Sequence, residues 1–208
     1  MYGLGLDGYD PDSQHDAAVA FLWGVAAGGV EVLGPLEGGG GAGVAAAQHR
    51  DHTVYAGGNV LIPSFALERS QEILYYLREG VETSVLPQSL RVYLDSPMAI
   101  SATEIFRRHP ECFDEETWQV LASGRDPFAL PGLQFTRESA DSIALKGMEG
   151  VVILAGSGMA TGGRIRHHLR NNLWRKEASV IFVGFAAKGT LAREIIDGAE
   201  EVHILHDS

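Results

Sequence analysis

A glycine-rich turn between an apolar run and a basic segment offers the clearest chemistry in this 208-residue sequence. The apolar run Val151–Ala155 is followed by four glycines, Gly156, Gly158, Gly162 and Gly163. Backbone amides at such a turn and at the start of a helix favour anions, and glycine lets a phosphate approach the backbone. The spacing matches neither the dinucleotide-binding pattern nor the P-loop pattern, so no nucleotide cofactor is predicted. Two interpretations remain: an anion site, or a turn whose glycines only permit tight packing.

The segment after this turn concentrates basic charge. Residues 164–176 contain no acid and seven basic or histidine residues, Arg164, Arg166, His167, His168, Arg170, Arg175 and Lys176. The whole chain carries a net charge of −11, which argues against a polyanionic partner, but residues 1–49 hold acids and no base. The local basic run therefore indicates either a polyanion contact or a solvated helix face. At most one of the two adjacent histidines can face a cleft, and we assign that place to His167.

Two further apolar runs end in polar residues. Asn59–Ile62 leads to Ser64, followed by a helical segment expected to expose Arg69 and Gln71, and Arg91–Leu94 leads to Asp95 and Ser96. Ligands of open parallel sheets bind beyond the carboxyl ends of the strands, so these residues and the glycine turn are expected at one edge. The alternative for Ser64 and Ser96 is that they cap helices.

The elements that must position these residues alternate between strand and helix. Short runs, mostly apolar on both faces, predict buried parallel strands at Asn59–Ile62, Arg91–Leu94, Val151–Ala155, Val180–Val183 and Val202–Leu205. Helical spacing occurs at Leu67–Arg78, Arg164–Leu173 and Leu191–Ile196. Residues 102–149 are expected to form a helical excursion that returns to the sheet through Gln134 and Phe135. The prediction is an α/β fold, a mostly parallel sheet with helices on both faces in a Rossmann-like three-layer arrangement.

Composition limits the class of protein. With 45% apolar residues the chain can bury a core. The longest apolar stretch, residues 17–27, is shorter than the ~20 residues that a membrane-spanning helix needs. The acidic start and the single cysteine, Cys112, favour a cytoplasmic protein with that thiol buried as an apolar group. Residues 1–52 form a divergent Gly/Ala-rich segment, and residues 53–208 are expected to form the α/β domain.

Four long strings carry a family resemblance. GGNVLIPSFALERSQEILYYL, VYLDSPMAISATEIF, VVILAGSGMATGGRIRHHLRNNLW and SVIFVGFAAKGTLAREIIDGAEEVHI resemble, in order and spacing, the β-CASP domain of metallo-β-lactamase-fold RNA-processing nucleases. The resemblance covers about residues 57–205 and is closest to prokaryotic members. It implies an α/β domain that is inserted into a zinc hydrolase and clamps RNA across the catalytic cleft.

The zinc ligands implied by this resemblance are not visible. Family members carry a His-x-His-x-Asp-His motif and further histidines outside the β-CASP insert, whereas here only Ala47–His52 is similar, and we interpret it as coincidence. Two-metal hydrolysis needs several converging ligands, so we assign no metal ligand, cofactor or catalytic residue. A mononuclear zinc site formed by His49, His52, His203 and His206 is the alternative.

Three functional hypotheses follow. The first is a β-CASP-like domain that binds RNA or another polyphosphate without cleaving it alone, through Ser64, Arg69, Ser96, Ser157, Gly158, Gly162, Gly163, Arg164, His167 and Lys188. The second is an active metal-dependent hydrolase with ligands from His15, Asp16, His49, Asp51 and His52. The third is a non-enzymatic scaffold that pairs with a metallo-β-lactamase-fold partner or with itself. No membrane partner is expected.

Overall fold

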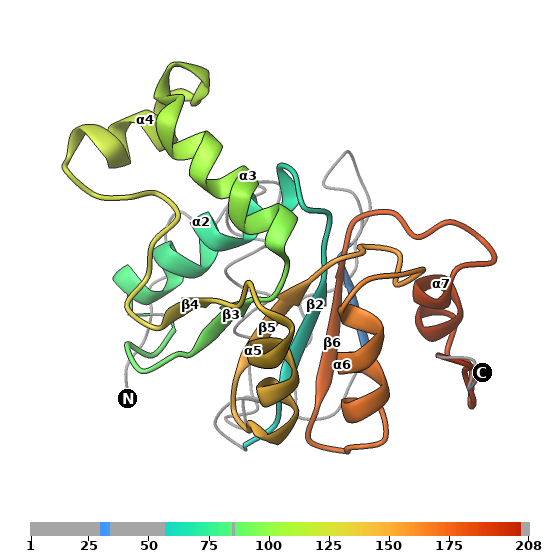
Figure 1. Ribbon diagram of the computed structural model, residues 1–208. Coiled ribbons are helices and arrows are strands. Elements are labelled where there is room, and N and C mark those ends of the chain that lie inside the picture. The colour runs from blue at the N-terminus through green and yellow to red at the C-terminus, as the bar shows by residue number, and fades with distance from the viewer. Residues whose placement is uncertain (1–29, 34–56, 85, 205–208) are drawn as a thin grey trace, which may run out of the picture.

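The described strands form one parallel sheet. The computed structural model describes residues 30–33, 57–84 and 86–204. In these residues six strands pair in the order β1-β6-β2-β5-β3-β4, every neighbouring pair parallel (Figure 1). Leu61 of β2 pairs with Ile153 of β5 on one side and with Val180 of β6 on the other. The predicted α/β fold with a mostly parallel sheet is confirmed.

The elements follow the predicted alternation closely. The strands are β1 (Val30–Leu33), β2 (Val60–Pro63), β3 (Val92–Leu94), β4 (Leu133–Phe135), β5 (Val152–Ala155) and β6 (Ser179–Val183). The helices are α2 (Arg69–Glu82), α3 (Pro97–Arg108), α4 (Glu115–Ala122), α5 (Ser139–Ala144), α6 (Ile165–Asn172) and α7 (Leu191–Ile196), with short 3₁₀ helices η1 (Pro110–Cys112) and η2 (Leu145–Gly147). The expected return to the sheet through Gln134 and Phe135 is β4.

Helices cover both faces of the sheet because the central strands are apolar on both sides. One face packs against α2 and α3, and its core contains Ile62, Leu94, Leu154, Leu74, Leu77 and Ile100. The other packs against η2, α6 and α7, and its core contains Leu61, Ile153, Phe182, Leu145, Ile165, Leu169 and Leu191. Each fully buried leucine, isoleucine or phenylalanine stabilises the fold by about 1.5–3 kcal/mol relative to an exposed one. The three-layer arrangement is therefore fixed by these two cores.

Two elements differ from the prediction. Residues 202–204 lie outside any strand, although Val202 and Ile204 pack against the core on the side of α7, which explains their apolar pattern. The segment 1–52, in contrast, contributes β1, which pairs with β6 at the edge of the sheet. The rest of that segment lies outside the described residues.

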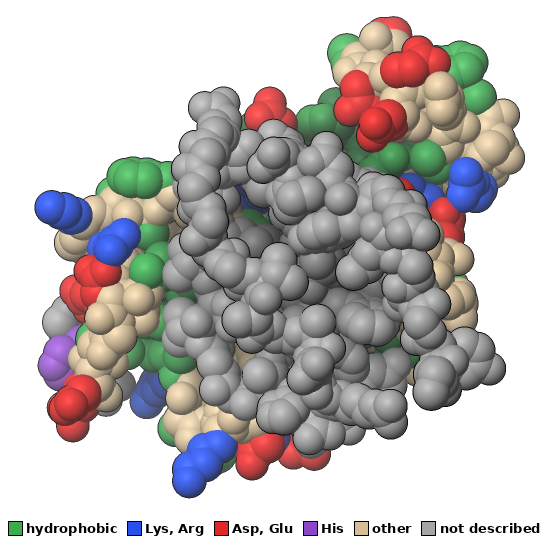
Figure 2. All heavy atoms as spheres, turned by 180° about the vertical axis from the view of Figure 1, so that it is seen from behind, with side chains coloured by type: hydrophobic (Ala, Val, Ile, Leu, Met, Phe, Trp, Pro, Cys, Tyr) green, Lys and Arg blue, Asp and Glu red, His purple; other side chains and the backbone are tan. Residues whose placement is uncertain are grey.

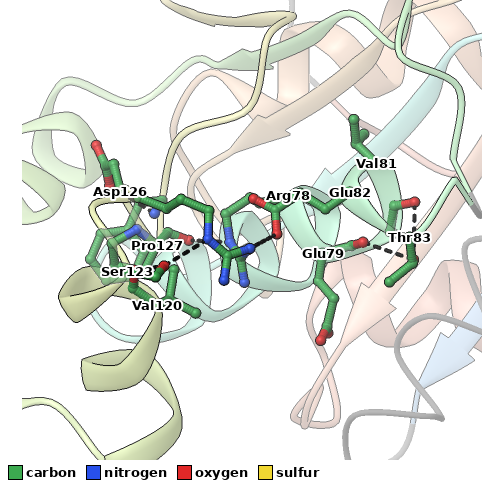
Figure 3. Close-up of polar contacts among 12 residues, drawn as sticks. Arg78, Glu79, Val81, Glu82, Thr83, Val120, Ser123, Asp126 and Pro127 are labelled. Carbon is green, nitrogen blue, oxygen red and sulfur yellow. Dashed lines mark hydrogen bonds and ion pairs between the residues drawn. The ribbon is translucent and has the colours of Figure 1, made fainter.

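An arm formed by α3, η1 and α4 projects from the sheet (Figure 1). Its base is fastened to α2 by Arg78, which is 3% exposed and donates from Nε to the carbonyl of Pro127 at 3.3 Å (Figure 3). Glu82 of α2 accepts hydrogen bonds from both Arg78 and Arg125. Acidic side chains gather on the arm (Figure 2), among them Glu111, Asp114, Glu115 and Glu116. This surface repels polyanions and so disfavours the arm as an RNA path.

None of the described helices has the length and apolar character needed to cross a lipid bilayer.

Candidate polyphosphate-binding site

Three neighbouring strands bring polar segments to one edge of the sheet. Since β5 lies between β2 and β3, the residues that follow these three strands lie together at the carboxyl ends of the strands. We call this end of the sheet the carboxyl edge. A Cβ added at Gly156 would lie 3.8 Å from the carbonyl oxygen of Ser64 and 3.8 Å from Oγ of Ser96. The convergence of Ser64, Ser96 and the glycine turn that the sequence predicts is therefore observed.

The turn after β5 is closed by its own backbone. The amide of Ser157 donates to the carbonyl of Gly162 at 3.1 Å. The amide of Ile165 donates to the carbonyl of Gly156, also at 3.1 Å. The peptide bond between Gly156 and Ser157 is cis. From Gly158 to Gly163, the amides of four residues donate to no protein acceptor in the described part of the chain: Gly158, Met159, Thr161 and Gly163. Unpaired amides in such a turn offer donors to an anion.

Glycine is required at one position of the turn and not at its neighbour. Gly163 has φ +75°, and a Cβ there would meet the carbonyl oxygen of Gly156 at 2.3 Å. At Gly162 a Cβ would meet nothing within 4 Å. The packing interpretation of the glycines thus holds for Gly163, whereas Gly162 leaves open space beside the turn.

A buried carboxylate at the end of β3 holds the turn in place. Asp95 is 0% exposed, and its two oxygens accept hydrogen bonds from Oγ1 of Thr136 at 2.7 Å, Oγ of Ser142 at 2.6 Å and the guanidinium of Arg164 at 2.8 Å. His168 Nε2 lies 2.6 Å from Oδ2. Burial alone would raise the pKa of Asp95, but these hydrogen bonds outweigh it and lower the pKa to about 2. Asp95 therefore links β3, α5, α6 and the turn as a carboxylate.

Arg164 does not lie where the sequence places it. We expected its side chain to contact a phosphate, but its guanidinium bonds Asp95 and also donates to the carbonyls of Thr136 at 2.9 Å and Arg137 at 2.8 Å. The side chain is only 21% exposed. Because a buried carboxylate needs a partner, the inward geometry is favoured over an outward one. This internal ion pair removes Arg164 as a phosphate contact and gives it the role of positioning the turn.

The two adjacent histidines separate as expected. His167 is exposed, whereas His168 is buried beside Asp95. The carbonyl of His168 accepts a hydrogen bond from Asn172 at 2.9 Å, and Asn172 in turn accepts one from Asn59 at 3.0 Å. Sequence reasoning missed these hydrogen bonds, which join α6 to the start of β2. The single hint was that His168 and Asn172 are four residues apart, on one side of a helix.

The remaining predicted residues differ in access to solvent. Ser64 is 2% exposed and shares a hydrogen bond with Ser70, so it neither caps a helix nor faces solvent. Ser96 is the N-cap of α3, which confirms the capping alternative. Arg69 forms an ion pair with Glu72. Gln71, expected to be exposed, is buried.

Ser157 and Lys188 keep access to the carboxyl edge. Ser157 is half-buried in the turn, and its Oγ accepts from the amide of Gly162 at 3.3 Å. Lys188 is exposed between β6 and α7. The start of α7 contacts the turn, because the amide of Ala192 donates to the carbonyl of Met159 at 3.2 Å. Lys188 lies only a few residues before this contact. Lys188 therefore remains a candidate cation for this site.

The described residues do not fit a zinc centre. Across residues 57–84 and 86–204, no three His, Cys, Asp or Glu side chains gather as metal ligands. The buried Asp95 is paired with Arg164 and His168, and no third metal-ligating side chain joins them among the described residues. The alternative ligands His15, Asp16, His49, Asp51, His52 and His206 lie outside the described residues. Cys112 is exposed, so its expected burial is wrong.

The parallel sheet with helices on both faces, and polar segments at its carboxyl edge, define an α/β domain of the doubly wound kind. The Beta-Casp domain family matches residues 70–195, so the chain belongs to the β-CASP family and the sequence resemblance is confirmed.

Relatives in this family are named for action on RNA or in transcription. The chain is 42% identical over 156 residues to Ribonuclease TTHA0252 of Thermus thermophilus, covering 74% of this chain and 36% of that protein. It is 36% identical over 157 residues to Transcription termination factor FttA of Methanocaldococcus jannaschii, covering 74% and 24%. The FttA of Methanosarcina mazei is 31% identical over 153 residues, covering 73% and 24%. The chain thus matches about a third or less of these relatives.

Proposed function

We propose that this β-CASP domain binds RNA or another polyphosphate at the carboxyl edge of its sheet. The observation that carries the proposal is the turn 156–163, whose amides at Gly158, Met159, Thr161 and Gly163 are unpaired within the described part of the chain. Family membership supports it, because relatives are named as a ribonuclease and as termination factors. A phosphate on this turn would accept from these amides.

Side chains around the turn take different parts in the proposal. Lys188 supplies the cation, and Ser157 supplies a hydroxyl within the turn. Arg164 contributes indirectly, since its ion pair with Asp95 fixes the backbone after Gly163. His167 is exposed on α6 and remains a candidate contact for a neighbouring nucleotide of the bound RNA.

The proposed binding is weak and sensitive to salt. The chain carries a net charge of −11, and the arm presents acidic side chains. Long-range repulsion therefore slows encounter, while only a few phosphates are neutralised locally. The slope of log affinity against log salt should correspond to those few contacts, about 0.7 for each phosphate of a single strand.

We further propose that the chain lacks the dinuclear zinc site and does not cleave RNA by itself. The support is that no described group of side chains suits even one metal ion. Two-metal hydrolysis requires ligands that hold both ions and activate water. The cytoplasmic location expected from the sequence stays a prediction.

Binding and cleavage are tested together on the purified chain. Fluorescence anisotropy of a labelled single-stranded RNA, at roughly 50 and 200 mM salt, should show binding that weakens as salt rises. Zinc quantification and incubation of the RNA with and without chelator should show no stoichiometric zinc and no cleavage. Absence of RNA binding at low salt would favour a scaffold that pairs with a metallo-β-lactamase-fold partner or with itself. Chelator-sensitive cleavage would favour the metal-dependent hydrolase.

A further inference from the structure

An aromatic ring rests on the glycine turn. Phe65 follows Ser64 at the end of β2 and is 45% exposed. A Cβ added at Gly158 would lie 2.9 Å from ring carbons Cδ2 and Cε2 and 3.3 Å from Cζ. The ring of Phe65 is therefore packed directly over Gly158, while nearly half of the side chain remains open to solvent.

The ring and the unpaired amides belong to one small surface. Gly158 lies under the ring, and its amide and that of Met159 are among the donors of the turn that find no acceptor in the described residues. A nucleotide carries a phosphate and a flat base that are joined by one sugar. Single-stranded nucleic acids are held by this combination of a backbone site and an aromatic side chain on which a base stacks.

Packing against the turn also prepares the ring for a ligand. A side chain already held against backbone loses less conformational freedom when a base stacks on it. Phenylalanine offers no polar group to read base edges, so the contact would tolerate any base. Such a contact distinguishes a base-bearing strand from an inorganic polyphosphate, which the phosphate contacts of the turn alone cannot do.

We infer that Phe65 is a stacking platform for one nucleobase of a single-stranded RNA whose adjacent phosphate occupies the turn 156–163. This inference rests on the proposed function and sharpens it, because it makes a nucleobase part of the ligand. The side chain of Phe65 then determines the preference for RNA over base-free polyanions.

The test compares a uridine oligonucleotide with an abasic strand of the same length and phosphate number. Both are titrated by anisotropy against the wild-type chain, Phe65→Leu, Phe65→Trp and Gly158→Ala. The control is Trp118→Leu, which removes an aromatic side chain of similar exposure, 51%, from the acidic arm. Circular dichroism and urea unfolding confirm that each variant is folded.

The wild-type chain should bind the uridine strand about tenfold more tightly than the abasic strand, as one base–aromatic stack would give. Phe65→Leu should abolish this ratio without changing the affinity for the abasic strand, and Phe65→Trp should restore it. Gly158→Ala should also reduce it, because the new methyl group displaces the ring. Trp118→Leu should leave both affinities unchanged.

Different failures have different meanings. Equal wild-type affinity for the two strands would overturn the stacking inference while the proposed polyphosphate site stands. A loss of both affinities in Phe65→Leu would also overturn it, because the ring would then only shape the turn. If the wild-type chain binds neither strand, the proposed function fails and the inference fails with it.

Discussion

The guanidinium of Arg164 lies 2.8 Å from a carboxylate oxygen of Asp95, across 69 residues of sequence. Arg164 stands between the glycine turn and α6, and Asp95 directly follows strand β3. The pair therefore fixes the distance between two segments of the carboxyl edge, and the proposed phosphate site depends on it without either residue contacting the phosphate.

Reversing the charge of Arg164 should lower the free energy of unfolding of the domain. Arg164→Glu places a second carboxylate beside the buried Asp95 and leaves that group without its guanidinium. Losing one partner of such a pair costs about 3 kcal/mol. Urea unfolding should show this loss in the free energy of unfolding.

Lys176→Glu is the matched control, because it makes the same charge change at an exposed position after α6. Its free energy of unfolding should stay within about 0.5 kcal/mol of the wild-type value. An Arg164→Glu chain as stable as this control would contradict the positioning role.

The stability contributed by Asp95 should depend on pH. Its pKa is lowered from 3.8 to about 2 in the folded chain, so the folded state favours the carboxylate. A lowered folded-state pKa gives stability that is present above the unfolded-state value and is lost as pH falls toward the folded-state value. Asp95→Asn, which cannot ionise, should therefore differ most from wild type near neutral pH.

Urea unfolding of both chains at several pH values measures this difference. The gap in free energy of unfolding should narrow by about 1 kcal/mol between about pH 5 and about pH 3. Other carboxylates titrate equally in both chains, so their effects cancel. A gap that stays constant over this range would show that the pKa of Asp95 is not lowered by folding.

The sheet could be predicted because a short run that is apolar at every position, such as Val152–Ala155, indicates a strand buried on both faces. They did not predict β1, since Val30–Leu33 lies in a segment without alternating strand and helix signals. Val202 and Ile204 gave a false strand, because apolar residues that pack against the core near α7 look the same in sequence.

The candidate site was only partly predictable. The positions of Ser96 and the glycines at strand ends could be predicted from the sequence. Turns and helix caps depend on residues that are close together in the chain. The inward direction of Arg164 could not be derived, because it is decided by the carboxylate of Asp95, far away in sequence. Isolated polar residues in a motif therefore show where a site lies better than which of them face the ligand.

The two glycines that end the turn should respond differently to alanine. Gly163→Ala requires a side chain at φ +75° and brings Cβ to 2.3 Å from the carbonyl of Gly156, so the backbone must move. The expected loss of stability is about 2 kcal/mol, with weaker RNA binding because the turn shifts. Gly162→Ala, where a Cβ meets nothing within 4 Å, should leave stability nearly unchanged. Urea unfolding and anisotropy titration of both variants check this, and equal stabilities would contradict the tight packing at Gly163.

Removing the charge of Lys188 should weaken RNA binding uniformly across sequences. Lys188→Ala should lower affinity about two- to fivefold, as expected for an exposed ion pair. One fewer neutralised phosphate should also reduce the slope of log affinity against log salt by about 0.7. Lys146→Ala is the matched control, because Lys146 is also exposed. It lies on η2, which precedes β5, and is therefore at the amino ends of the strands, away from the carboxyl edge. Anisotropy titrations over a series of salt concentrations measure both quantities. If Lys188→Ala and Lys146→Ala give the same slope, the RNA does not contact the carboxyl edge through Lys188, and the backbone amides and Ser157 of the turn are left as the proposed phosphate contacts.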